Sequence, residues 1–144
     1  DQAFEHDLKY PQALEIIKAL GDEAKRQDLE FGLKLTNTLE TQNFKDAFGD
    51  DVDMMYMSGR SLHPLTVNIA RKLQNDFNGQ LQLSFSGGAD AFNISDVLAA
   101  GFKTVTVSSD LLKPGGYMRL NQYFEEMQKR CKEANAQNIK ELIE

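Results

Sequence analysis

The sequence predicts an α/β fold with a parallel sheet of about four strands and flanking helices. Three observations support this prediction. Four short apolar runs begin about 22 to 27 residues apart, at 31–35, 54–57, 81–85 and 103–107. This distance is too long for hairpins but fits a strand, a helix and two loops. Finally, each apolar segment is a short run rather than a long alternation, as expected for parallel strands covered on both faces.

Helical patterns fill most of the gaps between these strands. Two of them begin at Pro11 and Pro64, because proline suits the first turn of a helix. A shorter helix ends before Gly101, a residue that favours the end of a helix. The last long helix has the most regular apolar stripe, which we interpret as core packing: Tyr117, Leu120, Phe124, Met127 and Cys131. Residues 134–144 should add a further turn or two.

The polar stretch 38–53 interrupts this pattern. It contains the loop signal Gly49-Asp50-Asp51, and we interpret the stretch as an irregular crossover with at most one short helix. The remaining order of strands and helices predicts right-handed βαβ units and therefore a parallel sheet. No linker or low-complexity segment divides the chain, so we expect a single domain over residues 1–144.

Composition and charge exclude several classes of protein. The chain has 144 residues, of which 41% are hydrophobic, and no apolar run approaches the ~20 residues that span a bilayer. The net charge of −6 disfavours nucleic acid as a partner. One cysteine and two histidines are too few for a zinc site or an iron–sulfur cluster. We expect a cytoplasmic protein without a metal site of its own.

Small polar residues follow each predicted strand and form the candidate binding site. In parallel α/β proteins, ligands lie at the carboxyl ends of the strands. The strongest signal is Ser86-Gly87-Gly88, because glycines let the backbone approach an oxyanion and the next helix directs N–H groups at it. Ser108-Ser109 follows the next strand, and two such loops often share one phosphate. The alternative is a tight turn with serines that cap helices.

Three other side chains have a functional and a structural interpretation. Lys34 lies inside a buried strand pattern, where it either contacts an anionic or electron-rich ligand group, reaches solvent along its stem or forms an ion pair. Arg60 either joins the site or is a solvated loop residue. His63 precedes Pro64 and is better interpreted as a loop or capping histidine than as a base.

The strand ends resemble those of the flavin barrels of dihydroorotate and dihydropyrimidine dehydrogenases. The resemblance runs from about residue 31 to 119 and rests on Lys34-Leu35-Thr36-Asn37, loop 58–66, Ser86-Gly87-Gly88 and segment 99–109. A closer resemblance, in runs 84–94 and 111–117, is to a family of large iron–sulfur oxidoreductases named for selenate reductase.

This resemblance implies FMN as a cofactor. By position, Lys34 would face the flavin ring, and the phosphate would lie at the glycines and serines of the last two strand ends. The resulting set of cofactor-binding residues is Lys34, Asn37, Ser58, Gly59, Ser86, Gly87, Gly88, Ser108 and Ser109. No catalytic residue is assigned. Iron–sulfur clusters would belong to the remainder of the parent polypeptide, since the chain has one cysteine.

We therefore expect the C-terminal half of a (β/α)8 barrel, cut from a larger oxidoreductase and inactive on its own. A half barrel exposes two sheet edges and an apolar inner face, so we also expect self-association or contact with the parent polypeptide. Two alternatives stay open. One is a scaffold that has lost flavin and docks the iron–sulfur and flavin domains of the parent. The other is a free-standing α/β enzyme that binds a phosphate sugar or a nucleotide.

Overall fold

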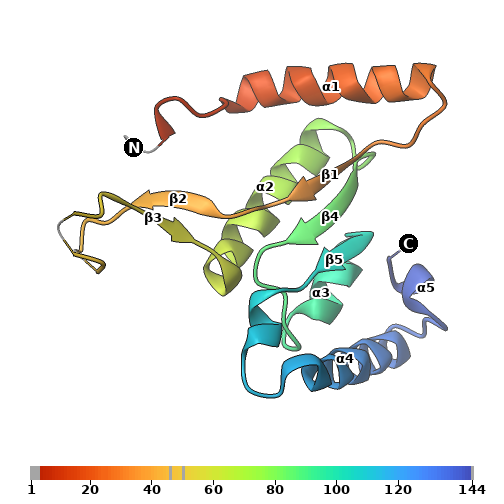
Figure 1. Ribbon diagram of the computed structural model, residues 1–144. Coiled ribbons are helices and arrows are strands. Elements are labelled where there is room, and N and C mark those ends of the chain that lie inside the picture. Colours follow the sequence, from red (N-terminus) through yellow and green to blue (C-terminus); the bar gives the residue numbers. More distant parts are fainter. Residues whose placement is uncertain (1–3, 46, 50, 144) are drawn as a thin grey trace. The chain divides into compact units, whose positions relative to one another are not determined.

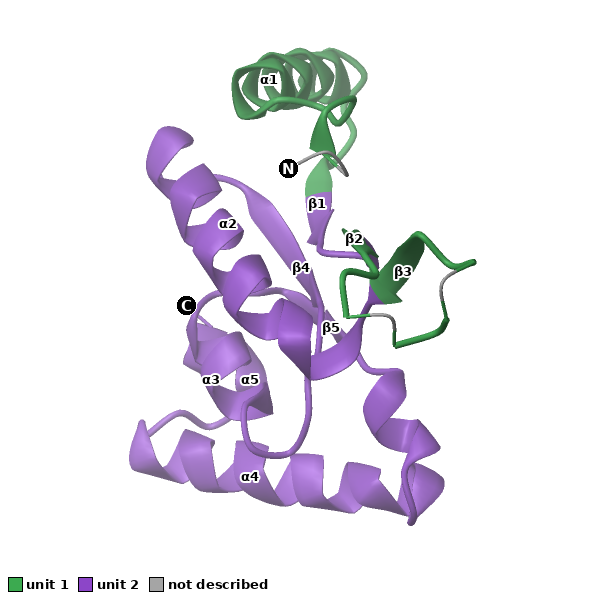
Figure 2. Cartoon of the chain, turned by 90° about the vertical axis from the view of Figure 1, so that its left-hand side faces the viewer, with its two compact units in different colours: residues 1–32, 40–56 green, residues 33–39, 57–144 purple. Residues whose placement is uncertain are grey.

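A computed structural model describes residues 4–45, 47–49 and 51–143 of the chain. The chain forms two compact units, which Figure 2 shows in different colours. The first unit comprises residues 1–32 and 40–56, and the second comprises residues 33–39 and 57–144. The second unit holds most of the sheet and the helices that cover it.

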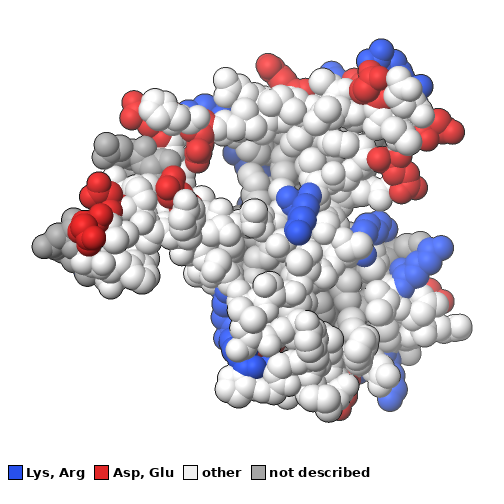
Figure 3. Space-filling view, in the orientation of Figure 1, with Lys and Arg blue, Asp and Glu red and all other residues white. Residues whose placement is uncertain are grey.

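The first unit consists of helix α1, Tyr10–Arg26, and most of a two-stranded sheet formed by β2, Leu39–Gln42, and β3, Met54–Met57. Proline in the first turn begins α1 as predicted. The two strands run in opposite directions in Figure 1. Acidic side chains gather over this hairpin on the face shown in Figure 3, in keeping with the negative charge of the chain.

The expected irregular crossover at 38–53 is therefore wrong, because the structure places a hairpin there. The backbone N–H of Asn43 donates to the carbonyl of Asp53 at 2.9 Å. The buried side-chain amide of Asn43 donates to Val52 O at 2.8 Å and to Gly49 O at 3.4 Å. These bonds close the loop between the strands, which polar composition alone did not reveal.

The second unit contains the parallel sheet. Its strands are β1, Gly32–Leu35, β4, Gln82–Ser86, and β5, Thr104–Thr106, in the order β1-β4-β5. Strands β4 and β5 are parallel, with Ser84 opposite Thr104. The predicted α/β fold class is confirmed. The second expected strand, at 54–57, forms as β3, but it pairs with β2, so the parallel sheet has three strands.

Four helices of the second unit follow the predicted order along the chain (Figure 1). They are α2, His63–Asp76, α3, Ile94–Ala99, α4, Leu120–Glu133, and α5, Ile139–Ile143. Helix α2 contacts β4, α3 contacts β5, and α4 packs on α3. Within residues 4–45, 47–49 and 51–143, no helix combines the length and the apolarity that crossing a membrane requires.

The core lies between the sheet and its covering helices. Phe85 of β4 is completely buried, and its ring meets that of Phe102 edge to face with centroids 5.2 Å apart. Ala70 of α2, Leu83 of β4 and Val97 of α3 complete this part of the core. The sheet and the two helices therefore depend on one continuous apolar cluster.

The opposite face of the sheet is polar, which corrects the expectation that both faces are apolar. Burial alternates along β4 and β5, and so do the side chains. Leu83, Phe85 and Val105 belong to the core, whereas the intervening positions carry polar side chains: Gln82, Ser84, Ser86, Thr104 and Thr106. The apolar inner face that suggested self-association is not formed by these two strands, and self-association itself stays a prediction.

The apolar stripe predicted for the last long helix is also only partly buried. Tyr117 and Phe124 are exposed, and Tyr117 precedes the helix in a 3₁₀ turn, Gly116–Arg119. The buried residue of α4 is Tyr123, which packs with Ala91 and Leu98. Tyr123 lies one position away from the stripe, so the helix is rotated relative to the predicted packing.

We predict that Phe85→Ala lowers the free energy of unfolding by about 3 to 5 kcal/mol, because a buried ring leaves a cavity. Phe124→Ala is the matched control, since that ring is 56% exposed. It should lower the free energy by less than about 1 kcal/mol. Urea unfolding followed by circular dichroism measures both, and equal losses would contradict the placement of the core.

Candidate functional site

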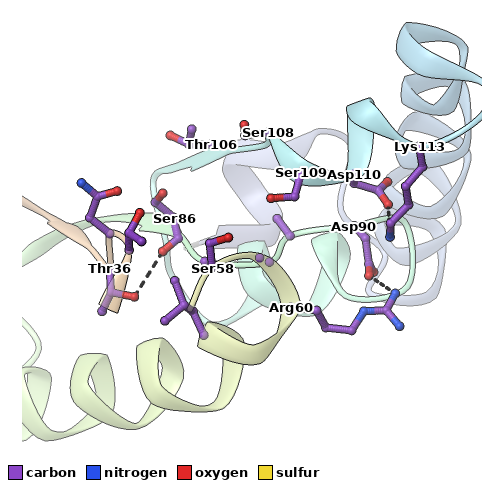
Figure 4. Close-up of a pocket in the computed structure, with 17 residues that line it drawn as sticks. Thr36, Ser58, Arg60, Ser86, Asp90, Thr106, Ser108, Ser109, Asp110 and Lys113 are labelled. Atoms are coloured by element: carbon purple, nitrogen blue, oxygen red, sulfur yellow. Dashed lines mark hydrogen bonds and ion pairs between the residues drawn. The ribbon is translucent and has the colours of Figure 1, made fainter. Parts of the chain in front are cut away.

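A cavity of about 520 Å³ lies at the carboxyl ends of the parallel strands, within the second unit. Figure 4 shows side chains from several strand ends pointing toward it. Its lining is rich in hydroxyl groups, which come from Thr36, Thr38, Ser58, Ser86, Thr106, Ser108 and Ser109. Such groups can donate hydrogen bonds to a ligand oxygen. The cavity is therefore suited to an oxygen-rich ligand.

The predicted binding residues gather in this cavity with one exception. Those that line it are Asn37, Ser58, Gly59, Ser86, Gly87, Gly88, Ser108 and Ser109. Lys34 is not among the lining residues. It is exposed and lies on the polar face of the sheet, because Leu33 and Leu35 on either side pack against the core. The side chain thus reaches solvent, which is one of the interpretations that the sequence left open.

Two loops approach each other so closely at Gly88 that there is no room for a side chain. Gly88 has φ of +77°, and an added Cβ would meet the backbone of Arg60 and, at 2.5 Å, the carbonyl oxygen of Gly59. The loop after β3 and the loop after β4 therefore touch through their backbones. We expected this glycine to make room for an oxyanion, whereas the structure also gives it a packing role.

Gly87 has a similar role beside the buried threonine of α2. A Cβ at Gly87 would lie 2.6 Å from Oγ1 of Thr66, which is fully buried. That hydroxyl donates to Leu62 O at 3.1 Å and lies 2.7 Å from the hydroxyl of Thr36. The backbone N–H of Thr36 donates to Ser86 O. These bonds tie the end of β1 to the end of β4 at the cavity wall.

The side chain of Asn93 fixes the loop that follows Gly88. Its amide donates to Gly88 O at 2.9 Å and its carbonyl oxygen accepts from the N–H of Asp90 at 2.9 Å. The same amide lies 3.3 Å from Nδ1 of His63, whose ring packs against Phe85. His63 is the first residue of α2 and contacts these structural residues, as expected for a loop or capping histidine.

Asp110 is a buried carboxylate that accepts four hydrogen bonds. Lys113 Nζ donates at 2.8 Å, Arg119 donates from Nε and Nη2 at 3.1 Å each, and the Tyr123 hydroxyl donates at 2.7 Å. Burial raises the pKa of Asp110, but the bonds from Arg119, Lys113 and Tyr123 outweigh burial and hold this pKa well below its usual range. Asp110 is therefore charged at neutral pH.

The pKa values of two partners of Asp110 are raised, whereas that of Asp110 is lowered. Burial, followed by the hydrogen bond to Asp110, raises the pKa of the Tyr123 hydroxyl. The hydrogen bond to Asp110 raises the pKa of Arg119. Tyr123 therefore keeps its proton and Arg119 keeps its charge. Neither is available as a base at neutral pH.

A second ion pair joins the loops after β3 and β4. Arg60 donates to Oδ2 of the buried Asp90, as Figure 4 shows. Oδ1 of Asp90 accepts from the backbone N–H of Phe92 at 2.9 Å, and the Arg60 guanidinium lies over the Phe92 ring at 5.8 Å. Arg60 thus lines the site. The sequence alone could not distinguish this role from that of a solvated loop residue.

Sequence reasoning missed the residues around Asp110. Asp110 was not assigned a role, and Tyr123 lies outside the predicted apolar stripe. One available signal was the acidic residue directly after Ser108-Ser109, followed by Lys113 and Arg119 within the next nine positions. Among the described residues, no cluster of histidine, cysteine, aspartate or glutamate is arranged to hold a metal ion.

The charged side chains of the cavity lining are paired with one another. Its two cations, Arg60 and Lys113, are each paired with a buried carboxylate, Asp90 and Asp110. A bound phosphate would therefore depend on hydroxyls and backbone N–H groups as well as on charge. The lining contains no histidine or cysteine, and its two carboxylates are in ion pairs. The arrangement supports binding and positioning.

The sheet order, the covering helices and the cavity at the strand ends define a segment of a TIM-barrel type of protein. The chain belongs to the family described as the N-terminal TIM-barrel domain of oxidoreductase YgfK, which it matches over residues 1–144. The expected oxidoreductase family is thereby confirmed, while the name selenate reductase stays a prediction.

Two curated relatives are YgfK proteins of Escherichia coli, from strain K12 and from O157:H7, and both carry the name of oxidoreductase. Each is 47% identical to the chain over 128 residues, which is 89% of the chain. The chain spans only 12% of the length of these relatives.

Solved structures of DHODH from Eimeria tenella have a similar fold. The ligand-free structure matches 95% of the chain and 36% of its own length, with 21% identity and a TM-score of 0.63. The complex with ferulenol matches 95% of the chain and 35% of its own length, with 21% identity and a TM-score of 0.64. At this identity the likeness shows the fold alone, and it agrees with a partial barrel.

We predict that Gly88→Ala destabilises the chain more than Gly79→Ala does. Both glycines have positive φ, +77° and +72°, but nothing lies within 4 Å of a Cβ at Gly79. Backbone strain should make the control cost about 1 kcal/mol, and the clash with the loop after β3 should add about 1 to 3 kcal/mol at Gly88. Urea unfolding measures the difference, and equal losses would show that the two loops do not touch.

The stabilising effect of Asp110 should depend on pH. Because its folded pKa is lowered, its contribution is complete above the unfolded aspartate pKa of about 3.9 and is lost as the pH falls toward the folded value. Asp110→Asn should lower the free energy of unfolding by about 3 kcal/mol at pH 7. The difference in the free energy of unfolding between Asp110→Asn and the unsubstituted chain should become smaller below about pH 4.

Asp96→Asn is the control for this experiment. Its side chain is 75% exposed and lies 3.9 Å from Arg130, so it should change stability little at any pH. Urea unfolding of all three proteins between pH 3 and 7 measures both effects. If Asp110→Asn lowers the free energy of unfolding by the same amount at every pH in this range, the lowered pKa of Asp110 is contradicted.

Proposed function

We propose that this segment holds the phosphate of FMN at its strand-end cavity, as part of a barrel in a multidomain oxidoreductase. The observation that carries this proposal is the meeting of two loops at one cavity: Gly87-Gly88 after β4 and Ser108-Ser109 after β5. Strands β4 and β5 are neighbours in the sheet and the last two strands along the chain. Loops after the last two strands commonly share a phosphate in TIM barrels.

Each group would have a defined part in this binding. The hydroxyls of Ser108 and Ser109 would donate to phosphate oxygens, together with backbone N–H groups of the Gly87-Gly88 loop. Bound FMN would supply electron transfer, while these residues would only hold and orient it. We assign Lys34 to the flavin ring and not to the phosphate, because it lies on the polar face of the sheet and outside the cavity lining.

A second candidate is a scaffold that keeps the barrel shape without flavin. Two observations favour it. Gly87 and Gly88 both have packing roles that need no ligand. Both cations of the cavity are already paired with carboxylates. In this case the segment would support domains elsewhere in the polypeptide, and the cavity would bind neither FMN nor phosphate.

The remainder of the polypeptide would supply the other redox groups. The chain covers 12% of the YgfK relatives, so their full activity needs far more than these residues. Iron–sulfur clusters depend on several cysteine thiolates, and Cys131 is the single cysteine of this chain. We therefore propose that the clusters are bound outside residues 1–144.

Isothermal titration of FMN into the complete natural polypeptide that contains these residues tests the proposal. We predict that substituting Ser108 and Ser109 together with alanine weakens FMN binding about tenfold, because charge-assisted hydrogen bonds to phosphate are lost. Ser95→Ala is the matched control. This serine lies on α3, outside the cavity, and its loss should leave the affinity unchanged.

Two results would contradict the phosphate site. Absence of FMN and phosphate binding in the unsubstituted polypeptide would favour the scaffold. FMN binding that the double serine variant leaves unchanged would place the flavin elsewhere in the polypeptide.

A further inference from the structure

We infer that Lys113 is the anion-contacting cation of the cavity and that Arg60 is a fixed structural residue. On binding of a phosphate monoester, the Lys113 ammonium moves from Asp110 to the phosphate, while Asp110 stays paired. This inference rests on the proposed phosphate site and assigns its charge selectivity to one residue.

Arg60 and Lys113 are similar in exposure, and each is paired with a buried carboxylate. Arg60 has a side chain that is 64% exposed and pairs with Asp90, whose side chain is 4% exposed. Lys113 has a side chain that is 49% exposed and pairs with Asp110, whose side chain is 3% exposed. All four residues line the cavity, and Figure 4 shows both pairs. The difference between the cations therefore comes from what each would leave behind.

Asp110 keeps a full set of partners when Lys113 moves. Arg119 still donates two hydrogen bonds at 3.1 Å, and the Tyr123 hydroxyl still donates one at 2.7 Å. The Arg119 side chain is only 22% exposed and also donates to Pro114 O at 3.4 Å, which holds it in place. A buried carboxylate that keeps an arginine and a tyrosine remains charged and satisfied.

The carboxylate of Asp90 has fewer hydrogen-bond partners than that of Asp110. Apart from Arg60, its carboxylate accepts one bond that the structure records, from the backbone N–H of Phe92 at 2.9 Å. Release of Arg60 would leave this buried carboxylate with one recorded hydrogen bond and only the longer-range attraction of Arg119, which is strongly unfavourable. Arg60 would also lose its contact with the Phe92 ring. Arg60 is thus held by the carboxylate that it stabilises.

Lys113 can also reach a ligand at the serines. It directly follows the 3₁₀ helix Ser109–Leu112, whose first residue lines the same cavity. A lysine carries its charge on a flexible four-carbon stem, so its ammonium can change partner without backbone movement. The ligand class that follows is a phosphate monoester with two negative charges. FMN should bind through this contact, and riboflavin, which lacks the phosphate, should not use it.

The test measures binding of FMN, riboflavin and inorganic phosphate to the complete natural polypeptide by isothermal titration, together with the melting temperature of each variant. Lys113→Gln should weaken FMN binding about tenfold and make it less sensitive to salt. It should leave riboflavin binding unchanged and lower the melting temperature by less than Arg60→Gln does, because Asp110 keeps Arg119 and Tyr123. Lys113→Arg should restore part of the FMN affinity.

Two further variants separate the roles. Arg60→Gln should lower the melting temperature and leave the FMN affinity of the folded protein within about twofold, because it acts through Asp90. Lys103→Gln removes the same charge from an exposed residue outside the cavity and should change neither quantity.

Three outcomes would overturn the inference. In the first, Lys113→Gln binds FMN as tightly as the unsubstituted protein does. In the second, Lys113→Gln lowers the melting temperature as much as Arg60→Gln does, so that Asp110 depends on this lysine. In both of these cases, the unsubstituted protein still binds FMN, so the proposed function is not contradicted. In the third, the unsubstituted protein binds neither FMN nor phosphate, and the proposed function fails together with the inference.

Discussion

The paired carboxylate of Asp110 is the interaction on which the strand-end cavity depends. A buried charge is unfavourable unless cations and hydrogen-bond donors surround it. Asp110 lies just after β5, and its donors come from the following turn, from Arg119 and from Tyr123 of α4. This network fixes the segment that carries Ser108, Ser109 and Lys113. The last strand and the last long helix are therefore positioned by the same group that shapes the cavity.

The opposite wall is set by close backbone packing. Loops after β3 and β4 approach so closely that Gly88 has no room for a side chain, and Gly87 packs on the buried hydroxyl of Thr66. Apolar side chains under β4 join this wall to α2 and α3. Because packing and buried polar groups both hold its walls, the cavity is preformed. A preformed site lowers the entropy that a ligand must lose on binding.

Sequence reasoning was successful where a general rule of topology applied. The carboxyl ends of parallel strands meet at one edge, so Ser58, Gly87 and Ser108 were expected together, and they line one cavity. It failed where partners are distant in sequence or where polar residues form strands. Tyr123 interacts with Asp110, which no helical period reveals. Strand β2 is too polar to be recognised as a strand from its composition.

These features describe a TIM-barrel segment with a hydroxyl-rich cavity at its strand ends, for which we propose a role in binding FMN. The most direct measurement is a crystal structure of the complete natural polypeptide at saturating FMN. The account predicts the phosphate between the Gly87-Gly88 loop and Ser108-Ser109, with the Lys113 ammonium turned from Asp110 to a phosphate oxygen. FMN bound only elsewhere, with this cavity empty, would contradict it.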